Sequence, residues 1–213
     1  MGAPPPTAWK RKSSPLPPDG YPDRVRSAYA TRETPWDIGV PAPELVRVLD
    51  ADLLRGKTFL EIGCGTGTNS IELARRGYRV TAVDLVDLAL EQAKEKAKKA
   101  KVEIDFRLGD FTKLELGGPF DCVVDVSVYD GIRTRNLAGF LEALRRASRT
   151  GTRWLSLAGS ATDPLPNGPP MVTEAEFRAE LEPMFTILDG HEFRYSLASG
   201  FEPLFWSILM ERR

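Results

Sequence analysis

The chain has 213 residues, of which 42% are hydrophobic, and its formal net charge is −1. This length and composition fit one globular domain with a sizeable core, and the near-neutral charge gives no basic surface of the kind that binds nucleic acid. The sequence has no stretch of the roughly 18 consecutive apolar residues that cross a bilayer, and its first residues lack the apolar segment of a secretory signal. We therefore expect a cytoplasmic protein that binds neither membrane nor nucleic acid.

The first part of the chain divides in two. Residues 1–20 contain six prolines and the basic trio at 10–12, with little to bury. We expect a flexible arm here, and a short nucleic-acid-binding tail is the alternative. Residues 21–213 then form the folded domain, and it begins with a cap segment, 21–43, in which aromatic side chains occur among turn residues. The prolines near its end open a helix with an apolar side, which leads toward the first strand.

Residues 58–67 read Thr-Phe-Leu-Glu-Ile-Gly-Cys-Gly-Thr-Gly, a strand-like run that breaks into glycines at alternate positions, and a helical pattern follows. Glycines tolerate positive φ and allow a ligand to approach the backbone, and the next helix offers unpaired N–H groups at its start. The turn therefore suits a nucleotide-like cofactor, although a glycine-rich turn without a ligand is the alternative. The glycine spacing departs from that of dinucleotide-binding proteins, because Thr68 stands where the third glycine belongs.

Two further strands follow. Residues 78–84 predict a strand that ends in Asp84, at about the 20-residue spacing typical of a carboxylate that binds ribose hydroxyls. A helix N-cap is the alternative role for this aspartate. The helix predicted over 89–101 carries charges of both signs and has a solvated face. The third strand, 102–108, runs into Gly-Asp-Phe at 109–111, which by itself reads as an aspartate-based turn.

The fourth strand, 120–126, is an apolar run typical of a strand that is covered on both faces. The carboxyl ends of the first and fourth strands flank the topological switch point, where open α/β sheets bind their ligands. We expect a helix over 136–149. The residues before it include Arg133 and Arg135, which either bind an anionic substrate or face solvent.

The remaining residues predict a fifth strand at 152–158 and a lid-like loop at 159–172. Loops of this length are usually functional or disordered. A helix over 173–181 has the capping signal of Thr173 with a glutamate three residues later. The last two segments, 185–195 and 203–210, have strand patterns.

The pattern E-x-G-C-G-x-G from Glu61 to Gly67 resembles motif I of the class I S-adenosylmethionine-dependent methyltransferases. The Trp-Asp-x-Gly segment at 36–39, and the Phe-Asp-x-x-x-Asp pattern at 120–125 with an aromatic and a polar residue after it, resemble the branch that methylates thiols, halides and thiopurines. The resemblance extends from about residue 30 to the C-terminus. It implies an α/β fold, a single-domain Rossmann-like sheet of seven strands, mostly parallel with the last strand antiparallel, and with helices on both faces.

The resemblance also implies S-adenosylmethionine as the cofactor. The cofactor-binding residues expected from it are Trp36, Glu61, Gly63, Cys64, Gly65, Thr66, Gly67, Asp84, Leu85, Asp110, Phe111 and Asp125. Trp36 either caps the cofactor or plugs the sheet edge. Asp84 is expected to bind the ribose, Asp110 the adenine amino group, and Phe111 the adenine ring. Asp125 fixes either the methionine amino group or a turn at the end of the strand.

Methyl transfer from a sulfonium is an in-line displacement in which the protein mainly orients the reactants. Soft nucleophiles such as thiolates, selenides and halides need no general base, whereas an alcohol or amine needs one. Tyr129 and Asp130, at the end of the fourth strand, are the expected catalytic residues that contact the acceptor. No metal-ligand spacing occurs in the sequence, and the single histidine, His191, is expected to be structural or exposed.

We therefore predict a methyltransferase, a monomer or homodimer, that uses S-adenosylmethionine and acts on a small-molecule acceptor with a soft nucleophile. The alternatives are an O- or N-methyltransferase of a heteroaromatic metabolite, a catalytically silent cofactor-binding domain, and a nicotinamide-dependent enzyme.

Overall fold

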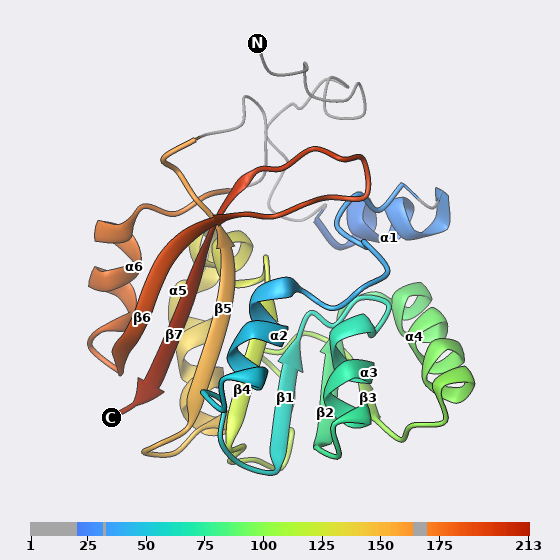
Figure 1. Cartoon of the computed structure of the whole chain (residues 1–213), viewed down its shortest axis with the longest axis horizontal. Coiled ribbons are helices and arrows are strands. Elements are labelled where there is room, and N and C mark those ends of the chain that lie inside the picture. The colour runs from blue at the N-terminus through green and yellow to red at the C-terminus, as the bar shows by residue number, and fades with distance from the viewer. Residues whose placement is uncertain (1–20, 32, 164–169) are drawn as a thin grey trace.

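The computed structural model describes residues 21–31, 33–163 and 170–213 (Figure 1). The predicted arm at 1–20 and the middle of the predicted lid-like loop, 164–169, lie outside the described residues. Among the described residues, no helix is long and apolar enough to cross a membrane.

The described residues form a seven-stranded sheet with the strand order β3-β2-β1-β4-β5-β7-β6. The strands are β1 (Thr58–Ile62), β2 (Arg79–Asp84), β3 (Asp105–Leu108), β4 (Cys122–Val126), β5 (Arg153–Gly159), β6 (Phe185–Arg194) and β7 (Leu204–Arg212). The pairs from β3 to β5 are parallel, and β7 runs antiparallel to both of its neighbours. The predicted fold class is confirmed: this is a Rossmann-like sheet, mostly parallel, with an antiparallel last strand.

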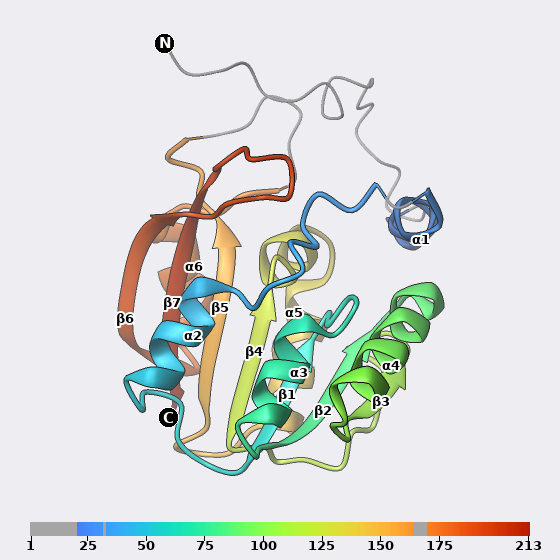
Figure 2. The same cartoon turned by 45° about the vertical axis from the view of Figure 1, so that its right-hand side comes forward.

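Helices cover both faces of the sheet (Figures 1 and 2). The helices are α1 (Tyr21–Thr31), α2 (Pro43–Asp50), α3 (Thr68–Arg75), α4 (Asp87–Ala100), α5 (Tyr129–Ala147) and α6 (Glu174–Leu181). One apolar core joins α2, α3 and α4 to the sheet, and a second joins α5 and α6 to the opposite face. Alternate residues of β1 enter the two cores: Phe59 lies in the first, and Leu60 and Ile62 lie in the second. The strands between the layers are apolar for this reason.

One helix is not predicted by the sequence pattern, and another begins well before its predicted start. The predicted cap segment starts with a helix, α1, instead of turns. The helix predicted over 136–149 is the second part of α5, which starts at Tyr129 and has a kink at Asn136, where φ is −152° and ψ is 56°. Asp125 accepts hydrogen bonds from the amides of Val128 and Tyr129, so the helix begins directly after β4.

Other predicted boundaries hold more closely. The third strand is shorter than predicted because Lys101 ends α4 in the left-handed conformation, with φ 57°, and the next residues form a connection. Helix α6 has the predicted capping box: the Thr173 side chain accepts from the Glu176 amide, and the Glu176 carboxylate accepts from the Thr173 amide.

Candidate cofactor and acceptor site

The glycine turn between β1 and α3 has a backbone that only glycine adopts easily. Gly63, Gly65 and Gly67 have φ values of +67°, +53° and +77°. A Cβ atom at Gly63 would lie 2.3 Å from Cγ2 of Val128, and one at Gly65 would lie 2.7 Å from the hydroxyl oxygen of Tyr29. The turn is thus a bare stretch of backbone at the carboxyl end of the sheet.

Glu61 connects β1 to the start of α3. Its carboxylate accepts hydrogen bonds from Nδ2 of Asn69, at 3.1 Å, and from the hydroxyl of Ser70. Asn69 also accepts the amide of Ala42 through Oδ1, so the network reaches the residue before α2. Burial raises the pKa of Glu61 to about 7. These contacts make Glu61 a residue that holds the turn in shape, rather than one with an exposed carboxylate.

We expect Glu61→Gln to change the pH dependence of stability. The raised pKa means that the folded protein holds this proton more tightly than the unfolded chain does, so the wild type loses stability as the pH rises toward about 7. Glutamine cannot ionise. The free energy of unfolding of the variant, relative to that of the wild type, should therefore rise by on the order of 3 kcal/mol between about pH 5 and about pH 8. Urea denaturation across this range measures the difference.

Glu142→Gln is the matched control. The pKa of the exposed Glu142 is lowered, mainly by a hydrogen bond from Arg145. Glu142→Gln should therefore lose stability relative to the wild type as the pH rises, which is the opposite of the effect of Glu61→Gln. The loss should be small because the pair is exposed. Parallel stability curves for Glu61→Gln and the wild type would contradict the assignment to Glu61.

Asp84 ends β2 beside the glycine turn. Its two carboxylate oxygens accept the amides of Gly65, at 2.8 Å, and Val86, at 2.9 Å. Burial raises its pKa, and the backbone hydrogen bonds oppose this effect. The neighbouring Leu85 side chain is 44% exposed. The carboxylate is thus fixed on the turn by backbone contacts, with an exposed apolar side chain next to it.

Three other predicted cofactor residues lie after β3 or within β4. Asp110 accepts the amide and hydroxyl of Thr112 through Oδ1 and forms an aspartate turn. The Phe111 ring is buried, with its centroid 5.6 Å from that of Phe140. Asp125 is fully buried, and besides its bonds to the start of α5 it accepts Nε1 of Trp154 at 2.9 Å. Of the two roles expected for Asp125, this geometry favours the turn at the end of the strand.

The cap segment lies on the glycine turn. Thr66 donates to Oδ2 of Asp37 at 2.8 Å, and Lys96 of α4 donates to Thr66 at 2.5 Å. The hydroxyl of Tyr29 accepts Nε1 of Trp36 at 3.2 Å. Trp36 remains 40% exposed and packs edge-on against the Tyr29 ring, with centroids 6.1 Å apart. The cap and the turn are therefore joined through side chains from both.

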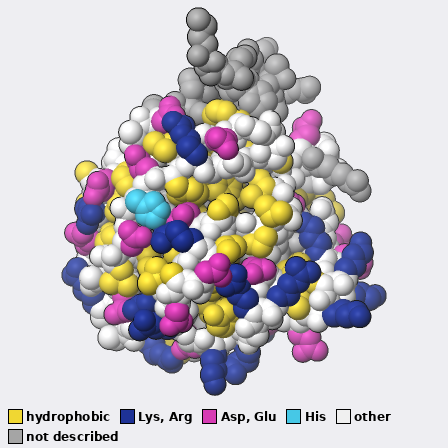
Figure 3. Space-filling view, viewed as in Figure 1, with side chains coloured by type: hydrophobic (Ala, Val, Ile, Leu, Met, Phe, Trp, Pro, Cys, Tyr) yellow, Lys and Arg dark blue, Asp and Glu magenta, His cyan; other side chains and the backbone are white. Residues whose placement is uncertain are grey.

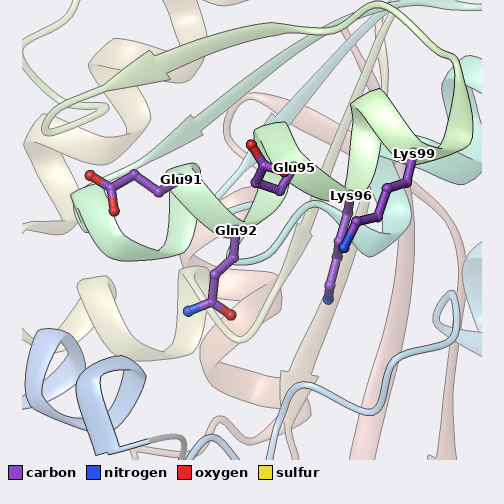
Figure 4. Close-up of a pocket in the computed structure, with 5 residues that line it drawn as sticks. All are labelled: Glu91, Gln92, Glu95, Lys96 and Lys99. Atoms are coloured by element: carbon purple, nitrogen blue, oxygen red, sulfur yellow. The ribbon is translucent and has the colours of Figure 1, made fainter.

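Two charged features lie on the surface around this site. A shallow groove is lined by side chains of α4 alone: Glu91, Gln92, Glu95, Lys96 and Lys99 (Figure 4). His191 lies among charged side chains on the front face (Figure 3), 3.2 Å from a Glu44 oxygen and 3.3 Å from an Asp189 oxygen. Within the described part of the chain, no group of histidine, cysteine or acidic residues could hold a metal ion.

The two predicted catalytic residues are enclosed. The Tyr129 side chain is 0% exposed, and its hydroxyl donates to Oε2 of Glu180 at 2.6 Å. Asp130 accepts the amides of Gly131, at 3.0 Å, and Gly159, at 2.9 Å, and burial raises its pKa to about 7. These positions argue against direct contact between Tyr129 and an acceptor, and they give Asp130 a role in fixing the end of β5 against the start of α5.

Neither alternative expected for Arg133 agrees with the structure, since it is neither a loop residue that faces solvent nor free to bind an anionic substrate. Arg133 lies in α5, and its guanidinium binds the Glu180 carboxylate, with a shortest distance of 2.5 Å, and Glu176, at 3.0 Å. Sequence reasoning also missed Asp37, Val128 and Lys96 as neighbours of the turn. For Asp37 a signal existed, because it lies inside the Trp-Asp-x-Gly segment.

The sheet order and the glycine turn define a Rossmann-like methyltransferase fold, and the comparisons agree. A family model described as a methyltransferase domain matches residues 59–151. Over 173 residues the chain is 26% identical to a 2-heptyl-1-hydroxyquinolin-4(1H)-one methyltransferase of Mycobacteroides abscessus, covering 79% of this chain and 76% of that protein.

Solved structures give the same result. A structure from work on the conversion of a disulfide bond into a thioacetal group during echinomycin biosynthesis has a TM-score of 0.77 and 26% identity, covering 89% of this chain and 91% of that one. The 1,6-didemethyltoxoflavin-N1-methyltransferase of Burkholderia thailandensis has a TM-score of 0.75 and 19% identity, covering 94% and 93%. The matched methyltransferase domain and these relatives support a methyltransferase that uses S-adenosylmethionine.

The turn fits this cofactor. Val128 and Tyr29 occupy the space where side chains at Gly63 and Gly65 would project, so only glycine fits at these two positions of the turn. Asp84 supplies hydrogen-bond acceptors and Leu85 an exposed apolar surface, which match a ribose and an adenine ring. These findings favour a methyltransferase over the two alternatives, a nicotinamide-dependent enzyme and a catalytically silent cofactor-binding domain.

Proposed function

We propose that this enzyme transfers a methyl group to a sulfur atom of a small molecule. The observation that carries the proposal is that the carboxylates at the acceptor end of the sheet already bind protein groups. Asp130 accepts two backbone amides, and Glu192 of β6 accepts the hydroxyl of Ser160 at 2.5 Å. A thiolate forms in water and attacks without losing a proton in the transition state, so it needs none of these groups as a base.

We infer that the cofactor lies across the carboxyl ends of β1, β2 and β3. The backbone at Gly63 and Gly65 would contact its methionine part, Asp84 the ribose, and Leu85 with Asp110 the adenine. When bound, the cofactor supplies an electrophilic methyl group on a sulfonium. The chain orients the two reactants and excludes water from the space between them.

The relatives support sulfur without deciding it. The neighbour from echinomycin biosynthesis concerns a disulfide that becomes a thioacetal, and it covers most of this chain. Selenide and halide acceptors share the property that they need no base, and they belong to the same proposal.

A second candidate is O-methylation of a hydroxylated heteroaromatic molecule. It rests on the similarity to the hydroxyquinolone methyltransferase, which extends over 79% of this chain. An acidic N-hydroxyl group is partly ionised in solution, so this acceptor also makes little demand on a protein base.

The test is product analysis with S-adenosylmethionine and a panel of thiophenol, pyridine-2-thiol, iodide, phenol and 2-heptyl-1-hydroxyquinolin-4(1H)-one. Mass spectrometry would identify the methylated atom and quantify S-adenosylhomocysteine. We expect the thiols to be methylated at sulfur without added metal. Turnover of only the hydroxyquinolone or phenol would reject the sulfur proposal and establish the second candidate.

A further inference from the structure

Tyr195, the residue after β6, has a buried aromatic ring with a hydroxyl group that no described residue binds. It is only 4% exposed, and its ring stacks on Phe205 with centroids 5.0 Å apart and 25° between the planes. Phe193 packs against its edge at 6.0 Å. Its backbone amide donates to the carbonyl of Pro203, which fixes the residue at the base of the β6–β7 connection. The ring is therefore held rigidly.

The Tyr195 hydroxyl, in contrast, makes no hydrogen bond with any described residue. Almost every buried polar group in a folded protein has such a partner, and tyrosine hydroxyls in cores usually find one. Two acidic side chains of this region are paired: Asp37 with Thr66, and Glu61 with Asn69 and Ser70. The Tyr195 hydroxyl is not among the fully buried unpartnered oxygens of the described residues, so it lies at an accessible end of a buried ring, where a ligand can reach it as an acceptor of its proton.

The Tyr195 ring belongs to an apolar core that reaches the acceptor end of the sheet. Tyr195 belongs to the core that contains Leu157 of β5, and Ile38 and Leu197 pack at the margin of that core. The connection between β6 and β7 extends over the ends of the strands toward the cap segment, where the Ala198 amide donates to the Pro35 carbonyl at 3.1 Å (Figures 1 and 2). The hydroxyl therefore belongs to a wall made by the cap and the β6–β7 connection.

The electrostatics keep this hydroxyl protonated. Burial raises the pKa of Tyr195 to about 12, and the carboxylates of Glu61 and Asp37 add to the effect. Glu61 precedes the glycine turn and Asp37 belongs to the cap segment, so both of these regions act on the Tyr195 hydroxyl. A neutral phenol is both donor and acceptor, but a negative surrounding favours its use as a donor toward an electron-rich atom of a ligand.

We propose that the Tyr195 hydroxyl donates a hydrogen bond to the methyl acceptor, and that the acceptor is a planar aromatic molecule with a hydrogen-bond-accepting atom besides the atom that is methylated. This inference rests on the function proposed above. Ligand sites in proteins combine apolar walls with few polar groups that fix orientation, and Tyr195 is such a group in an aromatic wall. Its role is to orient the acceptor and to select among acceptors.

The first test compares two thiols. The anion of pyridine-2-thiol, the form that is methylated at sulfur, has an accepting ring nitrogen beside the sulfur, and the thiophenol anion lacks one. Tyr195→Phe should raise the KM for pyridine-2-thiol about 10-fold, the usual value of one lost hydrogen bond at a ligand, and leave that for thiophenol unchanged. Tyr78→Phe, at a ring that packs on Phe59 4.5 Å away, is the matched control and should change neither. Equal changes for both thiols would reject the proposal.

The second test needs no turnover. The chain has five tyrosines, and ¹³Cζ labelling gives one resonance for each, with that of Tyr195 identified by its loss in Tyr195→Phe. In protein saturated with S-adenosylhomocysteine, pyridine-2-thiol or the hydroxyquinolone should shift the Tyr195 resonance in a saturable way. A shift caused by S-adenosylhomocysteine alone would place Tyr195 on the cofactor, and no shift at all would also overturn the proposal. A shift with the thiol but no methylated product would reject the sulfur function and leave this inference standing.

Discussion

Gly63→Ala should be the most damaging small substitution in the cofactor turn. The residue has φ +67°, and a left-handed conformation costs a non-glycine residue about 1–2 kcal/mol. The added Cβ would also lie 2.3 Å from Cγ2 of Val128, and such overpacking costs a further ~1–3 kcal/mol. We expect the free energy of unfolding to fall by roughly 2–5 kcal/mol, and S-adenosylmethionine affinity to fall with it. Urea denaturation and titration calorimetry measure the two losses.

Two controls separate the causes of this loss. Gly77 has φ +88°, and a Cβ atom added there would meet no neighbouring atom within 4 Å, so Gly77→Ala should show only the backbone cost and leave cofactor affinity intact. The double variant Gly63→Ala/Val128→Ala removes the Cγ2 methyl group that the new Cβ would meet. It should regain only the part of the unfolding free energy that is lost through overpacking. If Gly63→Ala costs no more than Gly77→Ala, the close contact with Val128 has no energetic weight.

Asp125→Ala is expected to have the largest effect among the acidic residues. This carboxylate is fully buried and accepts from the amides of Val128 and Tyr129 and from Nε1 of Trp154. Its removal leaves three buried donors without partners, which should lower the free energy of unfolding by roughly 3 kcal/mol or more. Chemical denaturation followed by tryptophan fluorescence measures the loss.

Asp121→Ala is the matched control for Asp125→Ala. Asp121 precedes β4 and also accepts backbone amides, from Lys57 at 2.8 Å and Thr58 at 3.0 Å, but its side chain is 21% exposed. Water can replace it, so the cost should be about 1 kcal/mol. Asp125→Asn should fall between the two alanine variants, because one oxygen remains as an acceptor while an amide hydrogen faces the Trp154 donor. Equal losses at 121 and 125 would contradict the importance of burial.

The sequence predicts the cofactor turn well because the relevant signals are local. Alternating glycines after an apolar run determine the backbone of residues 63–67 regardless of the rest of the chain. The helix boundary at Tyr129 is different, since it depends on a carboxylate of the preceding strand that binds two amides. The residues from Tyr129 to Asn136 have low helix propensity, and a kink divides them from the more regular part.

The roles of individual residues are less predictable because they depend on distant partners. Asp84 and Asp125 both lie near the carboxyl ends of strands and look alike in the sequence. Asp84, however, lies beside the glycine turn, whereas Asp125 is enclosed by a tryptophan of the neighbouring strand β5. Tyr129 and Tyr195 show the same contrast. The predicted acceptor residue Tyr129 has a partner on α6, whereas Tyr195, in a strand pattern without any motif, has none among the described residues.

The cap segment has a consequence for the binding of the two ligands. Within a few residues it contacts the glycine turn, through Asp37 and Thr66, and the β6–β7 connection, through Pro35 and Ala198. A cofactor that holds the cap segment against the glycine turn also holds the β6–β7 connection in place through the same segment. Binding of the cofactor and binding of the acceptor are therefore coupled. Each ligand should thus raise the affinity for the other by the same factor, so the methyl donor and the acceptor should bind cooperatively.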